Sequence, residues 1–369
     1  MQRRMLVSAA LLGVLTLSGC GESSAPAGNA SDAAPAQAPQ TVYRWKMVTT
    51  WPKNFPGLGT APERFAERLR AMSNGRLDVT VYAAGELVPA TEVLDAVSRK
   101  TAEMGHGAGY YWKGKIPAAQ FFSTVPFGLT AQEYNGWMFY GGGLELYREA
   151  YAPFGVVPWP GGNTGVQMGG WFNKEINNLD DLSGLKMRIP GIGGDVLQKA
   201  GATSVNLPGG EIFGALQAGT IDATEWVGPY NDLAFGLHRA ARFYYYPGWH
   251  EPGTAMELIV NSEALAGLPQ DLQAMIDIAA REMNADVLAE FTARNSDALQ
   301  DMRDKHQVDI RPFPEPVLAR LNELSEQVVS ELAAADPMAG KAYASYKAFR
   351  DRARPYTAMS EQAILNARP

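Results

Sequence analysis

The stretch LKMRIPGIGGDVLQKAGATSVNLPGGEIFGALQAGTIDATEW, residues 185–226, decides the fold. Its first part alternates between apolar and polar residues, as a strand with one buried face does. Apolar segments then recur between glycine stops, and they predict the order strand, helix, strand, helix, strand. In chain order, the expected segments are residues 184–191, 194–201, 203–208, 209–219 and 220–226. Strands that alternate with helices at this spacing favour a parallel α/β sheet.

The same order of elements occurs earlier in the chain. Residues 42–51 and 76–85 alternate like strands, and residues 61–75 between them have apolar residues at helical spacing before an Asn-Gly stop. Residues 89–107 predict a helix that leads into a short strand. Two such regions indicate an α/β fold with two similar lobes, arranged as a clamshell.

Crossover segments and a long helix would join the lobes. Residues 150–165 are rich in Pro and Gly, which suits a crossover, and residues 269–305 have a helical pattern far longer than the mean helix of about 11–12 residues. Such a helix is long enough to cross both lobes. The expected parts are lobe I at 41–163 with a later segment at 252–295, lobe II at 164–251 with a later segment at 296–340, and a C-terminal helical segment at 341–369.

Composition and charge exclude some partners. The chain has 369 residues, of which 46% are hydrophobic and 19% charged, and its formal net charge is −7. These proportions are ordinary for a soluble globular protein with room for two domains. The negative balance argues against nucleic acid or an anionic membrane surface as a partner.

The N-terminus has the pattern of an export signal. Arg3 and Arg4 precede a short apolar core, which ends in LSGC at Cys20. This tetrapeptide resembles a bacterial lipobox, so we expect a lipoprotein signal peptide at 1–19 and lipid attachment at Cys20. Residues 20–40 would form a flexible tether, which places the protein in the periplasm, anchored to a membrane. The alternative is a plain secretory signal with a chance cysteine.

Several catalytic and metal-binding motifs are absent from the sequence. Cys20 is the only cysteine, which excludes an internal disulfide and a cysteine metal site. GIGGDV at 191–196 fails the dinucleotide-binding pattern because its last position is Val. The four histidines show no ligand spacing. The pair His250-Glu251 is not dismissed, although a hydrogen-bonded loop explains it more simply. With no evident acid–base pair, we do not expect an enzyme.

Three polar residues stand out as candidate ligand-binding groups. Arg188 lies at the carboxyl end of a predicted strand, the edge at which α/β sheets bind ligands, and its guanidinium matches a carboxylate. A structural Arg–Asp pair is the alternative. Glu225 lies at the equivalent end of a later predicted strand. The alternative is that Glu225 is an acid at the start of the next helix. Gln167 lies in a short predicted strand. The alternative to a binding role is that its side chain is an ordinary surface amide.

Long motifs then suggest a family. MRIPG, EIFGALQAGTIDATEW and YPGWHEPG occur in order and with the spacing of the extracytoplasmic solute-binding proteins of TRAP transporters, which the chain resembles over nearly everything after the tether. More narrowly, it resembles the branch that binds 2-oxoacids or 2-hydroxyacids with a metal ion. The resemblance implies a periplasmic-binding-protein-like clamshell that captures a small 2-oxoacid such as pyruvate and delivers it to the TRAP membrane permease.

The resemblance also implies roles for the site residues. Arg188 would hold the substrate carboxylate, while Gln167, Glu225 and the backbone carbonyl of Trp226 would bind the ion. Trp226 takes the place of an Asn that is common in the wider family, which makes sugar acids doubtful substrates. Oxygen ligands suit Na⁺ or Ca²⁺. With Arg188, Glu225 and the substrate counted, a monovalent ion gives a neutral site, which slightly favours Na⁺.

Aromatic residues would form the walls of a small, dry pocket. Among the substrate contacts we include Gln167, Trp226, Tyr110 and Asn206, although Asn206 and Glu211 have an alternative role in capping and bracing the helix that follows. The other candidate wall residues are Trp51, Tyr111, Trp112, Tyr230 and Trp249. Each is also consistent with ordinary core packing.

Two further possibilities concern partners. The C-terminal segment is amphipathic, with Tyr343, Tyr346 and Phe349 close together, and the resemblance implies that such segments can pair as homodimers. The alternative functions are a receptor for an ABC importer or a sensor kinase and, in a different class, a lipid-anchored enzyme that uses the cation to polarise a 2-oxoacid.

Overall fold

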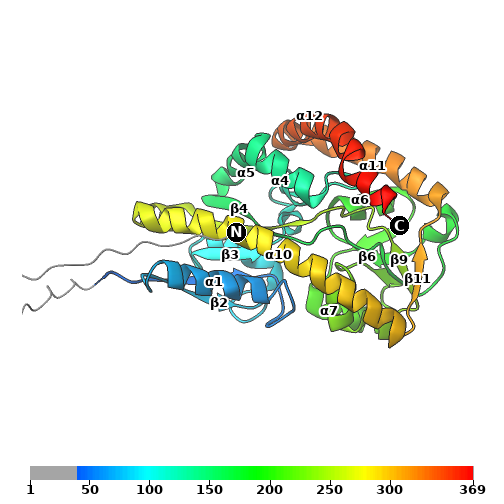
Figure 1. Cartoon of the computed structure of the whole chain (residues 1–369), viewed down its shortest axis with the longest axis horizontal. Coiled ribbons are helices and arrows are strands. Elements are labelled where there is room, and N and C mark those ends of the chain that lie inside the picture. The colour runs from blue at the N-terminus through cyan, green and yellow to red at the C-terminus, as the bar shows by residue number, and fades with distance from the viewer. Residues whose placement is uncertain (1–39, 369) are drawn as a thin grey trace, which may run out of the picture. The chain divides into compact units, whose positions relative to one another are not determined.

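Two mixed β-sheets, each covered by helices, organise the chain (Figure 1). The computed structural model describes residues 40–368. The predicted signal peptide, Cys20 and nearly all of the predicted tether lie outside the described residues. Within the described range, no helix combines the length and the apolar character that crossing a membrane requires.

The first sheet has five strands in the order β2-β1-β3-β10-β4. β1 pairs in parallel with β2 and β3, as the strand–helix–strand pattern predicts, but β10 is antiparallel to both β3 and β4. The strands are β1 (Tyr43–Thr49), β2 (Leu77–Tyr82), β3 (Met104–Gly107), β4 (Val156–Asn163) and β10 (Ala255–Asn261).

The second sheet has six strands in the order β11-β9-β5-β8-β6-β7. β6 is parallel to β7 and β8, whereas β5 runs antiparallel to β8 and β9. The parallel pairing expected for residues 184–226 is therefore present between β6, β7 and β8, but the sheet as a whole is mixed, because strands that enter it by a crossover from the other lobe run in the opposite direction. The strands are β5 (Gly170–Phe172), β6 (Lys186–Arg188), β7 (Thr203–Val205), β8 (Ala223–Thr224), β9 (Phe243–Tyr246) and β11 (Asp309–Pro312).

Helices follow most of the strands. Those before β10 are α1 (Thr60–Met72), α2 (Val93–Ser98), α3 (Ala119–Ser123), α4 (Ala131–Tyr140), α5 (Gly143–Tyr151), α6 (Gly191–Lys199), α7 (Gly209–Gln217) and α8 (Pro229–Phe235). Those after it are α9 (Ser262–Ala266), α10 (Gln270–Asp304), α11 (Glu315–Ala335), α12 (Pro337–Met359) and α13 (Glu361–Ala367). Short 3₁₀ helices are η1 (Ala90–Glu92), η2 (Gly109–Trp112), η3 (Ala152–Phe154), η4 (Leu179–Leu182) and η5 (Leu237–Arg239).

The predicted long helix and the two-lobed α/β architecture are confirmed. α10 has 35 residues and contacts β4 of the first sheet and α8 beside the second (Figure 1). The chain also passes between the sheets from β4 to β5 and from β9 to β10. Residues in these crossovers are therefore held between the lobes.

A buried acid anchors the first lobe. Glu257 on β10 is fully buried and accepts hydrogen bonds from the indole N–H of Trp112 and from the hydroxyls of Tyr147 and Tyr151. Burial raises the pKa of this carboxyl group, although the three donors act against that shift. Because Trp112 ends η2, Glu257 also fixes the segment that carries Tyr110.

We expect Glu257→Ala to lower the free energy of unfolding by about 3 kcal/mol or more, because it leaves buried donors without an acceptor and opens a cavity. Urea unfolding followed by circular dichroism measures this loss. The control is Glu149→Ala, which removes an exposed acid that pairs with Lys341. Equal stability of the Glu257→Ala and Glu149→Ala proteins would contradict the anchoring role.

The C-terminal helices belong to both lobes. α11 contacts α6, whereas α12 contacts α3, α4 and α5. Tyr343 and Tyr346 are buried, and the hydroxyl oxygen of Tyr346 accepts a hydrogen bond from the backbone N–H of Leu129 at 2.6 Å. Phe349 packs close to Gly136 and Gly141. These three aromatic residues therefore face the chain's own helices and do not form an exposed surface.

Candidate functional site

Sheet pairing brings two of the predicted site residues together. β6 and β8 are parallel neighbours, with Arg188 in register with Thr224, and Glu225 follows directly after β8. Arg188 ends β6, as predicted. Both side chains are about 1% exposed, and the backbone N–H of Glu225 donates to the carbonyl of Arg188 at 3.2 Å. The predicted strand 220–226 is shorter than expected, because only Ala223–Thr224 pair as β8.

The guanidinium of Arg188 is held on several sides. Its Nη1 donates to the carboxylate of Glu225 and, at 3.2 Å, to the backbone carbonyl of the same residue. Nε donates to the carbonyl of Leu207 at 3.2 Å, and Nη2 lies 3.5 Å from the hydroxyl of Tyr111. The guanidinium carbon also lies 5.2 Å from the centre of the Trp226 ring. Tyr111 belongs to η2 beside the first sheet, so the contact joins the two lobes.

The ion pair between Arg188 and Glu225 is costly to bury. Removing two charges from water costs several kcal/mol per ion, and their attraction repays this only when the geometry is good. The other guanidinium nitrogens of Arg188 have hydrogen-bond partners as well. The second carboxylate oxygen of Glu225 lies 3.5 Å from Nε2 of His250. A buried ion pair of this kind is well suited to a site in which Arg188 exchanges its carboxylate partner for a charged ligand.

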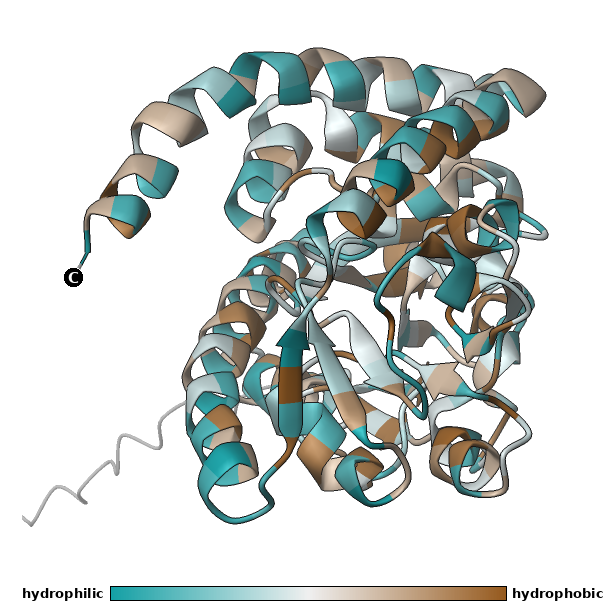
Figure 2. Ribbon diagram, turned by 90° about the vertical axis from the view of Figure 1, so that its right-hand side faces the viewer, coloured by the Kyte–Doolittle hydropathy of each residue, from teal (hydrophilic) through white to brown (hydrophobic). Residues whose placement is uncertain are grey.

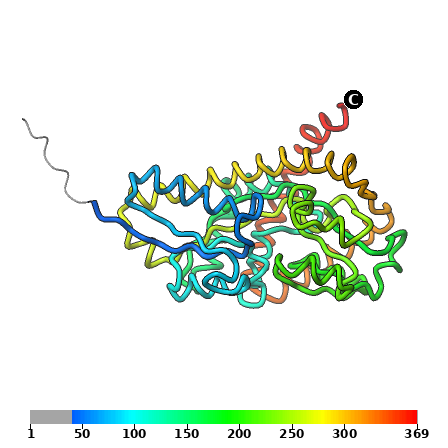
Figure 3. Tube along the Cα trace, turned by 90° about the horizontal axis from the view of Figure 1, so that it is seen from below, coloured from blue at the N-terminus to red at the C-terminus, as the bar shows by residue number. Residues whose placement is uncertain are grey.

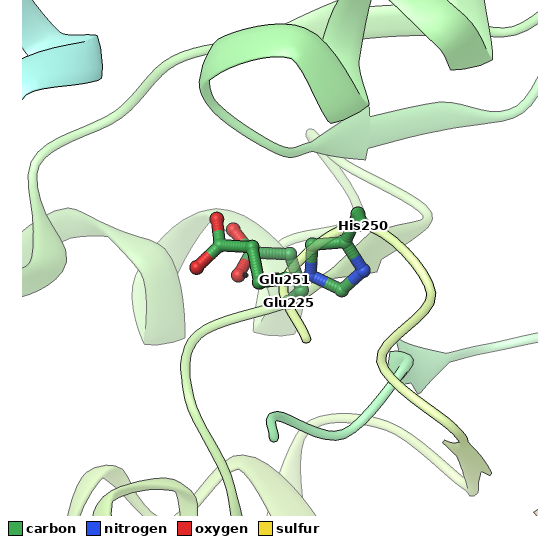
Figure 4. Close-up of side chains that lie close together, drawn as sticks. All are labelled: Glu225, His250 and Glu251. Atoms are coloured by element: carbon green, nitrogen blue, oxygen red, sulfur yellow. Dashed lines mark ion pairs between the residues drawn. The ribbon is translucent and has the colours of Figure 1, made fainter. Parts of the chain in front are cut away.

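The loop after β9 adds two ionisable groups to the site. One ligand atom each from Glu225, His250 and Glu251 lies within 4.8 Å of the others, and all three residues are buried (Figure 4). Burial raises the pKa of Glu251 to about 7, and the nearby charge of Glu225 adds to this shift. The hydroxyl of Thr254 donates to the Glu251 carboxylate. The HE pair in YPGWHEPG was a weak sequence signal for this cluster, and neither residue was among the predicted site residues.

Gln167 lies in a loop between β4 and β5, so its placement in a strand is wrong. Gly165 in this segment has a φ of 68°, in the left-handed region, and Val166 is 59% exposed. The backbone N–H of Gln167 donates to the carbonyl of Glu251 at 3.1 Å. The loop after β9 thus fixes the position of Gln167.

The side chain of Gln167 contains an orphaned acceptor. Its Nε2 donates to Thr164 at 3.1 Å, but Oε1 is buried and has no hydrogen-bond partner among residues 40–368. The loop comes so close that a Cβ on Gly248 would lie 2.4 Å from the Gln167 carbonyl oxygen, which explains the glycine there. A buried amide oxygen without a donor is a natural ligand for a hard cation.

Some of these residues, Arg188 and Gln167 among them, line one small cavity. Of the predicted residues it brings together Arg188, Gln167, Trp226, Tyr110, Trp51 and Tyr111.

Other candidate wall residues lie elsewhere. Trp112 is bound to Glu257, Tyr230 donates to Glu290 at 3.1 Å, and Trp249 stacks on Phe127. Their place in the wall is wrong, because local sequence could not say which face of each segment meets the cavity. Ordinary packing, the alternative given for these three residues, describes them better than a place in the cavity wall does.

Asn206 lies beside this cavity and lines two neighbouring hollows, together with Tyr111. The alternative of a helix cap is wrong for Asn206, because Pro208 is the N-cap residue of α7 and the cap has no side-chain hydrogen bond. Glu211 lies in the first turn of α7, where the helix dipole stabilises a carboxylate.

Trp226 limits the size of any ligand. Its ring lies so close to the start of α7 that a Cβ on Gly209 would be 2.6 Å from it, and it packs edge-on against Trp51 and Phe55. The indole N–H is buried, and no residue in the described part of the chain accepts a hydrogen bond from it. The cavity lining therefore combines aromatic rings with the guanidinium of Arg188 and the amide oxygen of Gln167.

Comparison with known proteins agrees with this arrangement. The model of the DctP family, described as bacterial extracellular solute-binding protein, family 7, matches residues 47–336. The chain belongs to the DctP family. This is a family of extracytoplasmic solute-binding proteins in transport and not a family of enzymes. The family and the general function expected from the sequence motifs are thus confirmed.

Close relatives of this DctP-family protein have assigned ligands. A monocarboxylate 2-oxoacid-binding periplasmic protein of Nostoc sp. is 43% identical over 330 residues, which cover 89% of this chain and 90% of that protein. A TRAP periplasmic solute-binding protein from Pseudoalteromonas atlantica, solved with bound sodium and pyruvate, is 43% identical with a TM-score of 0.87 and covers 89% of this chain and 100% of its own. One from Colwellia psychrerythraea, solved with calcium and pyruvate, is 42% identical with a TM-score of 0.86 and the same coverage.

Proposed function

We propose that this DctP-family protein captures a small 2-oxoacid such as pyruvate together with a cation, and delivers it to the membrane permease of a TRAP transporter. One observation carries the proposal. A guanidinium and an amide oxygen without a partner among the described residues belong to side chains that line one small, aromatic cavity, and the guanidinium pairs with the carboxylate of Glu225. The ligands of the related pyruvate-bound proteins have the matching chemistry.

Each site residue has a distinct role in this proposal. Arg188 binds the substrate carboxylate, for which its planar fork of donors is suited. Gln167, Glu225 and the backbone carbonyl of Trp226 hold the cation, and their oxygen atoms fit Na⁺ or Ca²⁺. The cation supplies the positive charge that Glu225 needs once Arg188 has turned to the substrate. Tyr110 and the ring of Trp226 exclude water and larger ligands.

Contacts between the lobes would hold the closed form. Lys113 beside the first sheet pairs with Asp195 on α6 at 2.8 Å, and Asn231 on α8 donates to the carbonyl of Pro56 at 2.9 Å. Opening of the lobes by a hinge motion would break these contacts and expose the cavity. Because the substrate contacts both lobes, its binding favours the closed form, which the permease would recognise.

Calorimetry tests the ligand. We expect pyruvate to bind in buffer with NaCl or CaCl₂, and to bind at least about tenfold more weakly in choline chloride with a chelator, because the acid at position 225 then repels it. A 2-hydroxyacid and a C4 dicarboxylate serve as comparison ligands. Pyruvate binding that is identical in all three buffers, or no binding in any of them, would contradict the proposal.

Uptake into vesicles tests the partner. Vesicles that contain the small and large TRAP membrane subunits should accumulate labelled pyruvate only when this protein is present. A receptor for an ABC importer or a sensor kinase would bind pyruvate without this uptake.

We also propose lipid attachment at Cys20. Labelling with a radioactive fatty acid would detect the lipid, and the Cys20→Ser substitution would remove it.

We propose in addition that the C-terminal helices form a homodimer. Tyr356 and Met359 near the end of α12, and Ile364 and Leu365 on α13, are more than half exposed. This end of the chain stands away from the rest of the described residues (Figures 2 and 3). Such an apolar surface suits burial against a second copy of the chain.

Light scattering tests the dimer. We expect the parent protein to have the mass of a dimer and the Ile364→Asp/Leu365→Asp protein to have that of a monomer, because two charges would be buried in the interface. Pyruvate binding is the control and should not change, since neither residue lines the cavity. A parent protein that stays monomeric at high concentration would exclude this interface.

A further inference from the structure

The first lobe contains a buried histidine, His106, that does not itself line the substrate cavity. It lies on β3, is 0% exposed, and pairs in the sheet with Thr49 of β1 and Leu258 of β10. Its Nδ1 lies 2.7 Å from the indole Nε1 of Trp51, and its Nε2 lies 2.8 Å from the carbonyl oxygen of Gly161 on β4. One side chain therefore joins the loop after β1 to the edge strand β4, across β10.

The two partners of His106 fix the position of its proton. An indole N–H can only donate, so Nδ1 accepts the hydrogen bond from Trp51 and the proton of the neutral ring lies on Nε2. Nε2 then donates to the carbonyl of Gly161. Burial lowers the pKa of His106 to about 4, although the bond to Gly161 acts against this shift, so the ring is neutral near pH 7. Both ring nitrogens thus have a partner, and the indole of Trp51 is held in one direction.

Trp51 connects this arrangement to the substrate cavity. Its side chain lines the cavity and is 2% exposed, and its ring lies edge-on to that of Trp226 with 6.3 Å between the ring centres. Trp51 follows β1 of the first sheet, whereas Trp226 follows β8 of the second, so this contact crosses between the lobes. Opening of the lobes would separate the two rings, and closing would restore the contact only if the indole of Trp51 had kept its direction.

The two hydrogen bonds of His106 support different parts of the cavity. A buried indole N–H without an acceptor is unfavourable, so without Nδ1 the ring of Trp51 would turn its N–H toward water and away from Trp226. The bond from Nε2 acts on β4, whose register against β10 shifts next to Gly161, shortly before the chain reaches Gln167. The contact with Trp51 therefore depends on Nδ1 alone, and Nε2 has a separate role in the sheet.

We propose that His106 is a positioning residue for substrate affinity, because its Nδ1 holds the ring of Trp51 where Trp226 meets it when the lobes close. This inference rests on the proposed function, since it assumes that a small 2-oxoacid binds in this cavity. A ring that is already held in the free protein does not have to be ordered during closure, so the closed form costs less free energy. His106 thus acts on the substrate through Trp51 and not by direct contact.

Two substitutions separate the hydrogen bonds of His106. His106→Asn can place an amide oxygen near the position of Nδ1, so it can accept from Trp51 but cannot reach Gly161. His106→Gln can place an amide N–H near the position of Nε2, so it can donate to Gly161 but leaves the indole of Trp51 without an acceptor. By calorimetry at saturating CaCl₂, we expect His106→Gln to bind pyruvate at least about tenfold more weakly than the parent, and His106→Asn to stay within about threefold of it.

Stability and a second substitution separate positioning from a merely structural role. Each of the two variants loses one buried hydrogen bond, so both should unfold at a lower urea concentration than the parent, although only His106→Gln should lose affinity. Trp51→Phe has no N–H to hold, so it should weaken binding as His106→Gln does, and adding His106→Gln to it should weaken binding no further. His306→Gln, which changes an exposed histidine that does not line the cavity, should bind pyruvate like the parent.

Three outcomes would overturn the inference. They are an equal loss of affinity in His106→Asn and His106→Gln, an unchanged affinity in His106→Gln, and effects of His106→Gln and Trp51→Phe that simply add. If His106→Gln does not fold, Trp51→Phe takes its place, and an unchanged affinity of that protein has the same meaning. In each case the parent would still bind pyruvate, so the proposed function would stand. A parent that binds no pyruvate with either Na⁺ or Ca²⁺ would instead refute the proposed function.

Discussion

Pyruvate should bind the Arg188→Ala protein at least about a hundredfold more weakly than it binds the parent, which is a loss of about 3 kcal/mol or more. The reason is that the substrate carboxylate would be buried without its cationic partner. Arg188 is 1% exposed and is the cation that lines the cavity in the part of the chain that the structure describes. Titration calorimetry at saturating CaCl₂ measures the change.

The same substitution also affects the protein without ligand. Glu225 would remain buried without the guanidinium, and breaking a buried pair in this way costs about 3–5 kcal/mol of stability. Weak binding could therefore result from partial unfolding. The double variant Arg188→Ala/Glu225→Gln removes both charges and should recover part of the lost stability, but none of the pyruvate affinity.

Arg188→Lys is the second control. It keeps the positive charge but loses the planar fork and the cation–π contact with Trp226, so we expect intermediate affinity. Urea unfolding of each variant shows whether the protein is folded under the binding conditions. A folded Arg188→Ala protein with the affinity of the parent would show that the carboxylate of the substrate binds elsewhere.

Much of the fold follows from local sequence. Periodicity in residues 185–226 predicts the succession of β6, α6, β7, α7 and β8, because glycine stops separate segments of clear strand or helix period. The meeting of Arg188 with Glu225 follows from the same pattern, since the carboxyl ends of adjacent parallel strands lie at one edge of a sheet. The length of α10 was equally readable, because no breaker interrupts its pattern.

The rest of the site depends on contacts that local patterns do not encode. Gln167 is positioned by backbone hydrogen bonds to Gly248 and Glu251, which are more than 80 residues away in the chain. The antiparallel directions of β5 and β10 follow from crossovers between the lobes. The sequence of a single strand does not indicate such a crossover. Glu251 was missed for the same reason, because its partner Glu225 lies on a different element of the second lobe.

Glu225→Gln should separate ion binding from substrate binding. We expect the variant to bind pyruvate with the same affinity in NaCl, in CaCl₂ and in choline chloride with a chelator, whereas the parent should differ by about tenfold or more. Glutamine offers one neutral oxygen in place of a charged carboxylate, so the cation loses its main attraction at Glu225. Affinity at saturating ion should fall below that of the parent, because the cation no longer neutralises the substrate charge.

This variant should lose less stability than Arg188→Ala. The guanidinium keeps its hydrogen bonds to the backbone carbonyls of residue 225 and Leu207, and the glutamine oxygen can still accept from Nη1. Pyruvate then supplies the missing negative charge, so its binding should raise the melting temperature of the variant even without added ion. Thermal unfolding with and without pyruvate, in each of the three buffers, measures this directly. An ion dependence in the Glu225→Gln protein as large as that of the parent would mean that other oxygen atoms hold the cation, and Glu225 would then serve only as the partner of Arg188.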